Sequence, residues 1–554
     1  MHLFSRNLRP GVLFPCLAAV VLTACADQLT APAARPSAPL IPSAALVMPA
    51  FSGNIRIGVV PSSSSITVGS NASWTLTNKA TGAVLMTGTS GGATITLAST
   101  SSSETRWRLQ VMCASAASVA TRKAAADALG HVTMTEVIPA CTRLLIGSYP
   151  LSASFTVRNN YKNLLISQGL AAADAFWRQI TIITGSIQYK AKRGADEVTS
   201  ANPVVLEAGT AQVLINGSPY RGVAEVAMNS AGTLAGINEA PLEEYLYGVV
   251  PRELPPTIWN QPEAQKAQAV AARTYALRGL GKRAADGYDL LPTTSDQVYG
   301  GYAAEHPVST AAIDATAGIV ATFKDASNND RLIEALFSST TGGWTAANEE
   351  IFNSAPVSYL RSVPDAQRGE AFEHVPTLEV FRNHGNPRSL RAEHNGSAEA
   401  QWSSRHRWTF EWTAEEISRV ISTAFAATVG KTSVGTVHEI NVLERGTSGR
   451  VTLIEFVTDE GTFTRAKDAI RSTLKYIDAS GNPQTLYSTL FFIEPVVDKK
   501  TQEIGFRVYG GGWGHGIGLG QTGAAGMAQK GATFDEILKH YYQGIDLMDY
   551  RSTP

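Results

Sequence analysis

The chain is organised around two stretches of sequence that lie far apart. The first is Glu244-Tyr-Leu-Tyr-Gly-Val-Val-Pro-Arg-Glu253, which runs into Gln265-Lys-Ala-Gln-Ala-Val-Ala-Ala-Arg-Thr-Tyr-Ala276. The second is Gly510-Gly-Gly-Trp-Gly-His-Gly-Ile-Gly-Leu-Gly-Gln521, whose glycines let backbone and ligand approach closely. The first presents a carboxylate, Glu253, beside a helix with polar groups, and the second presents an imidazole, His515. We predict that they form two walls of one active cleft.

The second half of the first stretch predicts a helix that packs closely against a neighbour. Gln261-Pro-Glu263 is a favourable start, because proline suits the first turn and an acid faces the positive end of the helix dipole. Small apolar residues then recur at helical spacing. Gln268 and Arg273 fall outside this apolar stripe, so their side chains can point elsewhere.

Glu253 lies in Val249-Val-Pro-Arg-Glu-Leu-Pro-Pro256, which predicts a rigid elbow rather than the interior of a helix. Apolar neighbours would remove part of the hydration of its carboxyl, which raises the pKa and suits a general acid. Spacing alone also allows an ordinary surface carboxylate that pairs with Arg252 or Arg273.

Length and composition describe a globular protein of several domains. At 554 residues two or three domains are expected, and 44% hydrophobic residues support a sizeable core. The 46 Lys and Arg nearly balance the 47 Asp and Glu, which argues against nucleic acid as the main partner. Stretches with strand and helix patterns follow one another in mixed order, which predicts an α+β fold.

The N-terminus has the pattern of an export signal. Two arginines precede an apolar run over residues 12–21, and Leu22-Thr-Ala-Cys25 resembles a bacterial lipobox. This predicts a lipoprotein signal peptide over residues 1–24 and a lipid on Cys25; an ordinary signal peptide with a chance cysteine is the alternative. Residues 25–50, rich in Ala, Pro and Ser, are predicted to form a tether. Ala26 provides no inner-membrane retention signal, which favours an outer-membrane anchor facing the periplasm.

Outside the signal region the chain has two cysteines, Cys113 and Cys141. Export implies an oxidising compartment, so the two are predicted to form one disulfide. Two buried free thiols are the alternative.

Residues 104–184 predict a small module. Helical patterns that end near residues 129 and 169 alternate with strand patterns at residues 107–111, 131–136, 143–147 and 176–183. The order β-α-β-β-α-β implies a ferredoxin-like sheet with strand order 4-1-3-2. Strands 1 and 3 are neighbours in that sheet, which places the two cysteines at one edge and makes a disulfide geometrically feasible.

Through Leu109-Gln-Val111, residues 125–129 and this topology, the module resembles the SPOR domain, which binds peptidoglycan glycan strands that lack stem peptides. An unrelated α+β insert is the alternative. Strand patterns at residues 54–98 and 203–238 flank the module. We therefore predict that residues 51–103 complete the same β-rich core into which the module is inserted.

The two opening stretches resemble the SpoIID/LytB family of peptidoglycan lytic transglycosylases. Three further blocks carry the resemblance: Gln297-Val-Tyr-Gly300, Phe337-Ser-Ser-Thr-Thr-Gly-Gly343 and Tyr359-Leu-Arg-Ser-Val363. The resemblance implies a SpoIID-type catalytic domain over residues 200–554, with a mixed β-rich core and a packed helical segment. The family's catalytic glutamate falls on Glu253.

The reaction that the resemblance implies is cleavage of the bond between N-acetylmuramic acid and N-acetylglucosamine. Most glycosidases need two carboxyl groups. In a lytic transglycosylase the muramoyl 6-hydroxyl attacks instead and gives a 1,6-anhydro end. One carboxyl, Glu253, can then protonate the leaving oxygen and accept the proton of the attacking hydroxyl.

Around Glu253 we predict substrate-binding side chains of several chemical types. Amide and guanidinium groups would contact sugar and acetamido groups, hydroxyls would contact glycan oxygens, an indole would stack on a sugar face, and an imidazole would bond Glu253 or a sugar hydroxyl. A core tryptophan and a structural histidine are the alternatives for the indole and the imidazole. The residues are Gln268, Arg273, Ser338, Ser339, Thr341, Trp513, His515 and Gln521.

One departure from the family concerns metal binding. Some members carry cysteines before the Gln-Val-Tyr-Gly block and bind zinc there, whereas here that stretch is Leu290-Leu-Pro-Thr-Thr-Ser-Asp296. Zinc prefers Cys and His ligands. We therefore predict no metal at this place and no cofactor.

These patterns together predict a lipid-anchored envelope enzyme whose partners are peptidoglycan glycan strands and, through its anchor, a membrane. Three alternatives stay open at this point. One is a non-catalytic glycan-binding protein or amidase enhancer, the second is an envelope scaffold, and the third is a hydrolase that uses water.

Overall fold

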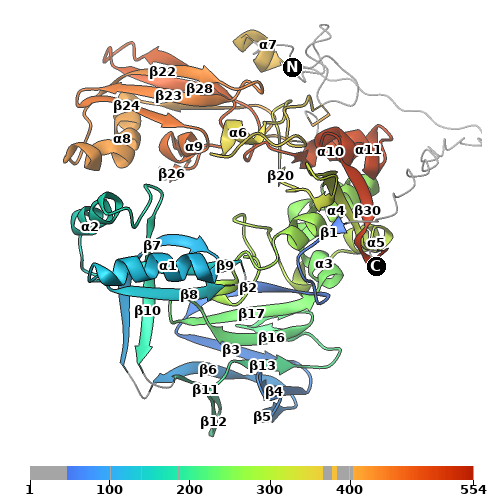
Figure 1. The fold of residues 1–554 in the computed structure, drawn as a ribbon. Helices are drawn as coiled ribbons and strands as arrows, with labels where there is room; N and C mark the ends of the chain where they lie inside the picture. The colour runs from blue at the N-terminus through green and yellow to red at the C-terminus, as the bar shows by residue number, and fades with distance from the viewer. Residues whose placement is uncertain are drawn as a thin grey trace, which may run out of the picture. The chain divides into compact units, whose positions relative to one another are not determined.

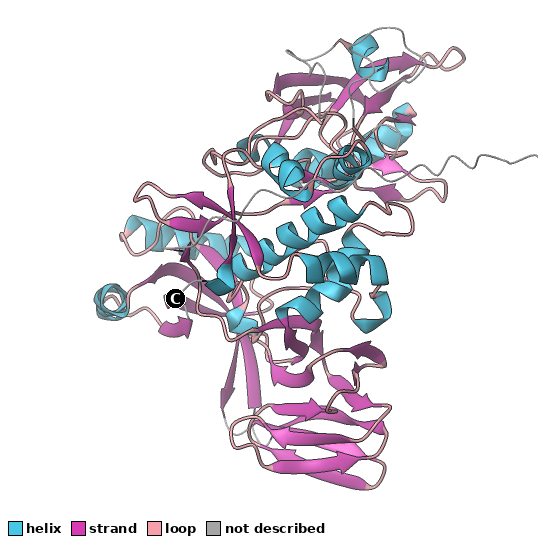
Figure 2. Ribbon diagram, turned by 90° about the vertical axis from the view of Figure 1, so that its right-hand side faces the viewer, coloured by secondary structure: helices cyan, strands magenta, loops and turns pink. Residues whose placement is uncertain are grey.

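The computed structural model describes residues 46–99, 102–138, 140–184, 187–365, 377–383, 398–399 and 403–552. The predicted signal peptide, the predicted lipid-bearing Cys25 and most of the predicted tether lie outside these residues. Helices and sheets are mixed along the chain, as Figures 1 and 2 show, so the fold is α+β as predicted. None of the helices in the described ranges combines the length and the apolarity that crossing a membrane requires.

Two six-stranded antiparallel sheets form a β-sandwich. One has the order β12-β11-β6-β3-β14-β15 and the other β2-β17-β16-β13-β4-β5. Apolar side chains from both sheets, such as Ile95 and Val226, share one core. The strands are β2 (Asn54–Ser63), β3 (Ser65–Ser70), β4 (Trp74–Asn78), β5 (Val84–Gly88), β6 (Gly91–Ser99), β11 (Ile187–Arg193), β12 (Asp196–Ser200), β13 (Val204–Glu207), β14 (Val213–Ile215), β15 (Ser218–Tyr220), β16 (Val223–Met228) and β17 (Leu234–Pro241).

Strands from before residue 100 and after residue 186 belong to the same sheets, because β6 pairs with β11 and β2 pairs with β17. The chain between β6 and β11 forms a four-stranded antiparallel sheet of order β10-β7-β9-β8 with two helices, α1 and α2. This is the strand order that the sequence predicted. The elements are β7 (Ser102–Ala114), α1 (Ala116–Ala128), β8 (Thr133–Ile138), β9 (Cys141–Pro150), α2 (Phe155–Ser167) and β10 (Phe176–Thr184).

This segment has a hydrophobic core of its own, which includes Leu109, Leu144 and Leu165. Serine side chains cap the N-termini of both helices and satisfy backbone N–H groups there. A disulfide joins Cys113 at the end of β7 to Cys141 at the start of β9, with Cα atoms 5.5 Å apart. The predicted pairing of the two cysteines is therefore confirmed.

Helices follow the sandwich directly. They are α3 (Leu242–Glu253), α4 (Pro262–Arg278) and α5 (Pro307–Ala315), and alanines such as Ala269 and Ala272 let α4 pack closely within their shared core. A sheet of order β1-β19-β18-β30 adjoins them, formed by β1 (Leu46–Val47), β18 (Ile319–Lys324), β19 (Asp330–Leu332) and β30 (Asp546–Asp549). Because Leu46 and Val47 pair with β19, the predicted tether is wrong in its last residues, which form a strand.

The later part of the chain contains a further β-rich core. A sheet of order β21-β28-β27 and another of order β22-β23-β24 share apolar residues with α8, such as Trp412 and Phe456. The elements are β21 (Trp408–Trp412), α8 (Ala414–Phe425), β22 (Val437–Arg445), β23 (Val451–Thr458), β24 (Gly461–Ala466), α9 (Ala469–Thr473), β25 (Tyr476–Ile477), β26 (Pro483–Gln484), β27 (Phe491–Val497) and β28 (Ile504–Gly510).

Two short strands connect the sequence blocks that were predicted to face one cleft. β20 (Phe337–Ser338) pairs in parallel with β29 (Leu519–Gly520), which brings the 337–343 block against the end of the glycine-rich stretch. The helices α10 (Gln521–Gln529) and α11 (Phe534–Tyr541) follow immediately, and both pack against α4.

Candidate active site

A cavity of about 850 Å³ lies where the two opening stretches meet. Its lining includes Glu253 from the end of α3, Trp513 and His515 from the glycine-rich stretch, and Gln521 from the start of α10. Ser338 and Ser339 line it as well. Side chains that lie up to 268 positions apart therefore share one concave surface.

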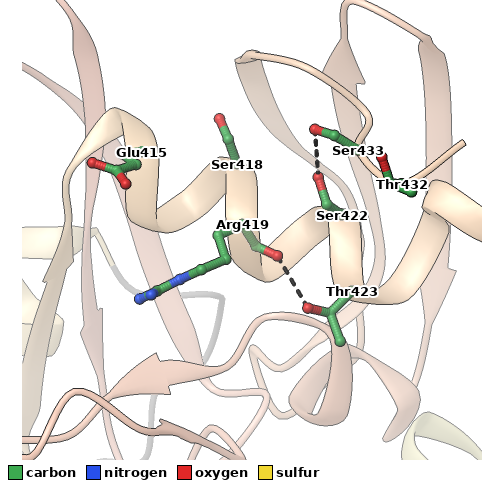
Figure 3. Close-up of a pocket in the computed structure, with 7 residues that line it drawn as sticks. All are labelled: Glu415, Ser418, Arg419, Ser422, Thr423, Thr432 and Ser433. Carbon is green, nitrogen blue, oxygen red and sulfur yellow. Dashed lines mark hydrogen bonds between the residues drawn. The ribbon is translucent and has the colours of Figure 1, made fainter.

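A smaller hollow of about 430 Å³ lies over α8, and Figure 3 shows its lining. Its hydroxyl groups mostly bond one another or nearby backbone: Ser422 bonds Ser433, and Thr423 donates to the Arg419 carbonyl. Its acid, Glu415, is exposed to solvent. Because an exposed carboxyl keeps its full hydration, this hollow lacks the desolvated acid that the larger cavity offers.

Glu253 is the last residue of α3, which continues through Pro251 instead of ending before a separate elbow as predicted. Its Oε1 accepts the Val298 N–H at 2.6 Å and its Oε2 accepts Gln521 Nε2 at 3.3 Å. Burial raises the pKa of Glu253, while both hydrogen bonds and the charge of Arg252 act in the opposite direction. The carboxyl thus holds its proton to a higher pH than an exposed glutamate.

The alternative of a paired surface carboxylate is not what the structure shows for Glu253. Within the described residues it forms no ion pair, and Arg273 pairs with Glu243 instead. Gln297 fixes its partner Val298: the Gln297 side chain accepts a hydrogen bond from Tyr245 and donates to a backbone carbonyl of α4. The Gln-Val-Tyr-Gly block therefore orients Glu253, a role that the sequence did not reveal.

Gln268 lies behind Gln521 and does not line the cavity. Gln521 Nε2 is 3.3 Å from Gln268 Oε1, the same distance as from Glu253 Oε2. Gln268 is fully buried, and its Nε2 has no hydrogen-bond partner among the described residues. Gln268, which was predicted to contact a sugar, instead accepts a hydrogen bond from Gln521, the side chain that contacts Glu253.

Two other predicted sugar-binding side chains also point away from the cavity. Arg273 is fully buried and donates to both carboxylate oxygens of Glu243, at 2.8 and 2.6 Å. Thr341 donates its hydroxyl to Glu399 at 3.0 Å. Both were chosen by residue type and spacing, which do not determine the direction of a side chain.

Both rings of the glycine-rich stretch, Trp513 and His515, line the cavity, and His515 is also fixed by hydrogen bonds to the backbone. His515 Nδ1 accepts the Ile517 N–H at 3.0 Å, and a further hydrogen bond links the ring to the Phe337 backbone. Burial lowers the pKa of His515 to about 4, so the ring is neutral at neutral pH. Trp513 is 47% exposed, which excludes the alternative of a core tryptophan.

The cavity has other carboxylates, which sequence reasoning missed. Asp296 is held by Lys282 at 2.5 Å and Arg283 at 3.1 Å, and Asp468 pairs with Arg471 at 3.1 Å. Burial opposes ionisation of Asp296, but its hydrogen bonds, led by that from Lys282, lower its pKa. Asp296 and Asp468 are therefore paired with cations, whereas Glu253 forms no ion pair within the described residues. Glu334 also lines the cavity.

No cluster of three or more His, Cys, Asp or Glu side chains in the described ranges is arranged to hold a metal ion. The groups named above can transfer protons and form hydrogen bonds in the cavity.

Comparison with known proteins identifies the class to which this fold and cavity belong. The family described as Stage II sporulation protein, SpoIID, matches residues 230–323, which contain Glu253 and α4. A domain of unknown function, DUF8618, matches residues 346–518.

Relatives extend the match over more than half of the chain. It is 30% identical over 319 residues to an uncharacterized protein of Brachyspira hyodysenteriae, across 57% of this chain and 69% of that protein. It is 27% identical over 331 residues to stage II sporulation protein D of Bacillus subtilis, across 56% and 76%. It is 28% identical over 320 residues to the amidase enhancer of Bacillus subtilis, across 55% of this chain and 40% of that protein.

The chain belongs to the SpoIID/LytB family. Membership in this family supports a role related to the cell wall.

Proposed function

We propose that the protein is a lytic transglycosylase that cleaves peptidoglycan glycan strands between N-acetylmuramic acid and N-acetylglucosamine. The observation that carries the proposal is the state of Glu253: its carboxyl lines an 850 Å³ cavity, its pKa is raised by burial, and it forms no ion pair within the described residues. A protonated acid in a concave site is what departure of a sugar oxygen requires.

The reaction needs one carboxyl group acting twice. Glu253 first gives its proton to the glycosidic oxygen as the bond to C1 of the muramoyl unit breaks. The 6-hydroxyl of the same unit then bonds to C1, and its proton passes to the Glu253 carboxylate. No water is consumed, so the product is a 1,6-anhydro end and the acid is restored.

The two hydrogen bonds to Glu253 serve both steps. Val298 N–H and Gln521 Nε2 each donate to one carboxylate oxygen. They fix the direction of the carboxyl, and they stabilise the carboxylate that exists between the two proton transfers. Burial and hydrogen bonding thus oppose each other, which keeps both protonation states accessible.

Substrate contacts are assigned to the side chains that line the cavity. The Ser338 hydroxyl is buried and has no hydrogen-bond partner among the described residues, so a sugar oxygen can supply one. Ser339 offers a second hydroxyl, and Trp513 offers an exposed ring for a sugar face. Gln268, Arg273 and Thr341 hold the surrounding elements in place.

The remaining parts of the chain complete the proposal. Residues 104–184 act as a SPOR-like module that holds the enzyme on glycan strands without stem peptides, which raises the local concentration of substrate. The signal peptide over residues 1–24 and a lipid on Cys25 place the protein in the cell envelope, anchored in the outer membrane. The catalytic domain then spans residues 200–554.

Digestion of purified sacculi with the wild type and with Glu253→Gln tests the proposal. We expect soluble muropeptides from the wild type and none from the variant, while both sediment with sacculi. Retained solubilisation by the variant would contradict the proposed role of Glu253. If neither protein cuts but both stimulate an added amidase, the protein is an enhancer, in line with the name of one relative.

A further inference from the structure

We propose that an aromatic strip forms a second glycan-binding surface that extends the cavity, and that Arg405 on this strip binds an acidic sugar. The strip consists of Trp513, Tyr487, Tyr476 and Phe410. The inference rests on the proposed function, because the ligand is a more distant part of the same polymer.

The rings of the strip follow one another at contact distance. The Trp513 and Tyr487 centroids are 6.0 Å apart, and those of Tyr487 and Tyr476 are 5.1 Å apart. Tyr476 stacks on Phe410 at 4.1 Å with an interplanar angle of 7°. Phe410 also lies 5.3 Å from Tyr487, so Trp513 adjoins a compact group of three rings, and the four rings form one continuous surface.

The strip begins in the cavity and is fixed to its wall. Trp513 lines the cavity, and the N–H of its neighbour Gly514 donates to the Tyr487 carbonyl at 3.0 Å. On the other side of Trp513, the Gly512 N–H donates to the Arg405 carbonyl at 2.8 Å. A glycan strand that occupies the cavity at Trp513 can therefore continue along the strip.

The exposure of the rings suits a sugar chain. Trp513 is 47% exposed, and the other three rings are half-buried, with part of each packed on the core around Trp412 and Phe456. Packing on this core holds the rings in place, so little conformational entropy is lost when a ligand binds. The accessible parts of the rings offer apolar surface, which is what the C–H faces of sugar rings require.

Arg405 gives the strip a charge preference. Its guanidinium lies 4.3 Å from the Tyr487 ring centroid and 5.6 Å from that of Trp513. Within the described ranges it forms no ion pair with a carboxylate. A guanidinium in this position can bind a carboxylate through two parallel hydrogen bonds. In a peptidoglycan glycan strand the lactyl group of muramic acid supplies that carboxylate once the stem peptide is absent, whereas N-acetylglucosamine has none.

Binding measurements in a Glu253→Gln background test the strip without any cleavage. The ligands are soluble glycan strands freed of stem peptides and, for comparison, neutral chitin oligosaccharides of the same length, measured by titration calorimetry. The variants are Arg405→Gln and Tyr476→Leu, and Tyr302→Leu is the matched control. Tyr302 is 39% exposed and has Arg221 at 5.2 Å from its ring, but it belongs to neither the cavity lining nor the strip.

We expect Arg405→Gln to bind the acidic strands about tenfold more weakly and chitin unchanged, since loss of one charged contact costs about 1.4 kcal/mol. Tyr476→Leu should weaken both ligands, and Tyr302→Leu neither. Residues 104–184 are identical in all variants, so differences between them report on the strip.

Equal affinity of all three variants for the acidic strands would overturn the inference. Arg405→Gln keeps this outcome decisive if Tyr476→Leu loses stability, because Arg405 is not part of the hydrophobic core. The readout needs no turnover. If the wild type never cuts glycan but the strip variants still bind the acidic strands more weakly, the transglycosylase proposal is contradicted and the inference about the strip stands.

Discussion

Two glutamates, the half-buried Glu253 and the fully buried Glu399, show how differently one kind of side chain is used in this molecule. Burial raises the pKa of both carboxyl groups. Glu399 is 0% exposed and accepts the N–H groups of Thr341 and Gly342, at 2.7 and 2.6 Å, and the Thr341 hydroxyl at 3.0 Å. Glu253 accepts two hydrogen bonds and is open to the cavity.

The two carboxyl groups differ in how far they can still accept hydrogen bonds from a ligand. The hydrogen bonds to Glu399 come from the block that carries Ser338 and Ser339, and His406 Nδ1 adds another contact at 2.8 Å. Glu399 therefore holds one wall of the cavity in shape. Glu253 keeps accessible oxygen atoms in the cavity, so chemistry is assigned to the glutamate that the protein leaves partly unsatisfied.

Identical amide substitutions at the two glutamates should separate chemistry from stability. We expect Glu253→Gln to lower kcat on glycan strands about a thousandfold, because it removes the general acid. Its free energy of unfolding should stay within about 1 kcal/mol of the wild type, because the new amide can still accept the Val298 N–H. Muropeptide release and denaturant unfolding measure the two quantities. A stable variant with undiminished kcat would refute the role of Glu253.

Glu399→Gln should have the opposite profile. The substitution replaces one carboxylate oxygen by an amide nitrogen, which cannot accept a hydrogen bond from the N–H groups around it. We therefore expect the free energy of unfolding to fall by about 3 kcal/mol. The same denaturant titration measures it. Unchanged stability together with a large loss of kcat would mean that Glu399, and not Glu253, takes part in the reaction.

The neighbourhood of Glu399 also predicts how stability depends on pH. Burial and then the charge of Glu399 raise the pKa of Asp365, whose Oδ2 accepts the Glu399 N–H at 3.2 Å. The folded state binds a proton that the unfolded state releases above about pH 4, so this contribution is fully present below that pH and is lost as the pH rises. We expect stability to fall by at most about 1.4 kcal/mol per pH unit on this account. In Glu399→Gln, which lacks the repelling charge, the slope should flatten.

A smaller effect is expected at Gln521. Its amide donates to the Glu253 carboxylate, which favours the charged form and lowers the pKa of Glu253. In Gln521→Met the pKa of Glu253 should rise, so the acid should stay protonated to higher pH. The alkaline limb of the pH–rate profile should therefore move to higher pH. Gln543→Met, at an exposed glutamine that bonds the His540 carbonyl, is the control. A limb that stays in place would show that Gln521 does not act on Glu253.

The sequence predicted the cavity residues correctly where their place depends on a local sequence block. It predicted them poorly where their role depends on the direction in which a side chain points. Glu253, Trp513 and Gln521 line the predicted cleft because each belongs to a block whose backbone folds as a unit. Arg273 and Thr341 come from equally clear blocks, yet each donates to an acid that does not line the cavity: Glu243 for Arg273 and Glu399 for Thr341. A buried charge must have a partner, and that partner cannot be read from spacing.

Other parts of the site had no sequence signal. Asp468 and Arg471 lie in the cavity wall, but no motif surrounds them and their contribution depends on how a separate β-rich core packs. Arg405 is likewise an isolated residue until the fold places it beside Tyr487. By contrast, the strand order of the 102–184 segment followed from its pattern, because alternation and helix length are local properties.

The most direct test of the transglycosylase proposal is the mass of the glycan ends that the wild type produces in heavy-oxygen water. Intramolecular attack by the 6-hydroxyl predicts ends lighter by one water than hydrolysis products, with no heavy oxygen incorporated. Ends that carry one heavy oxygen would show that water is the nucleophile and would contradict the mechanism in which Glu253 serves as both acid and base.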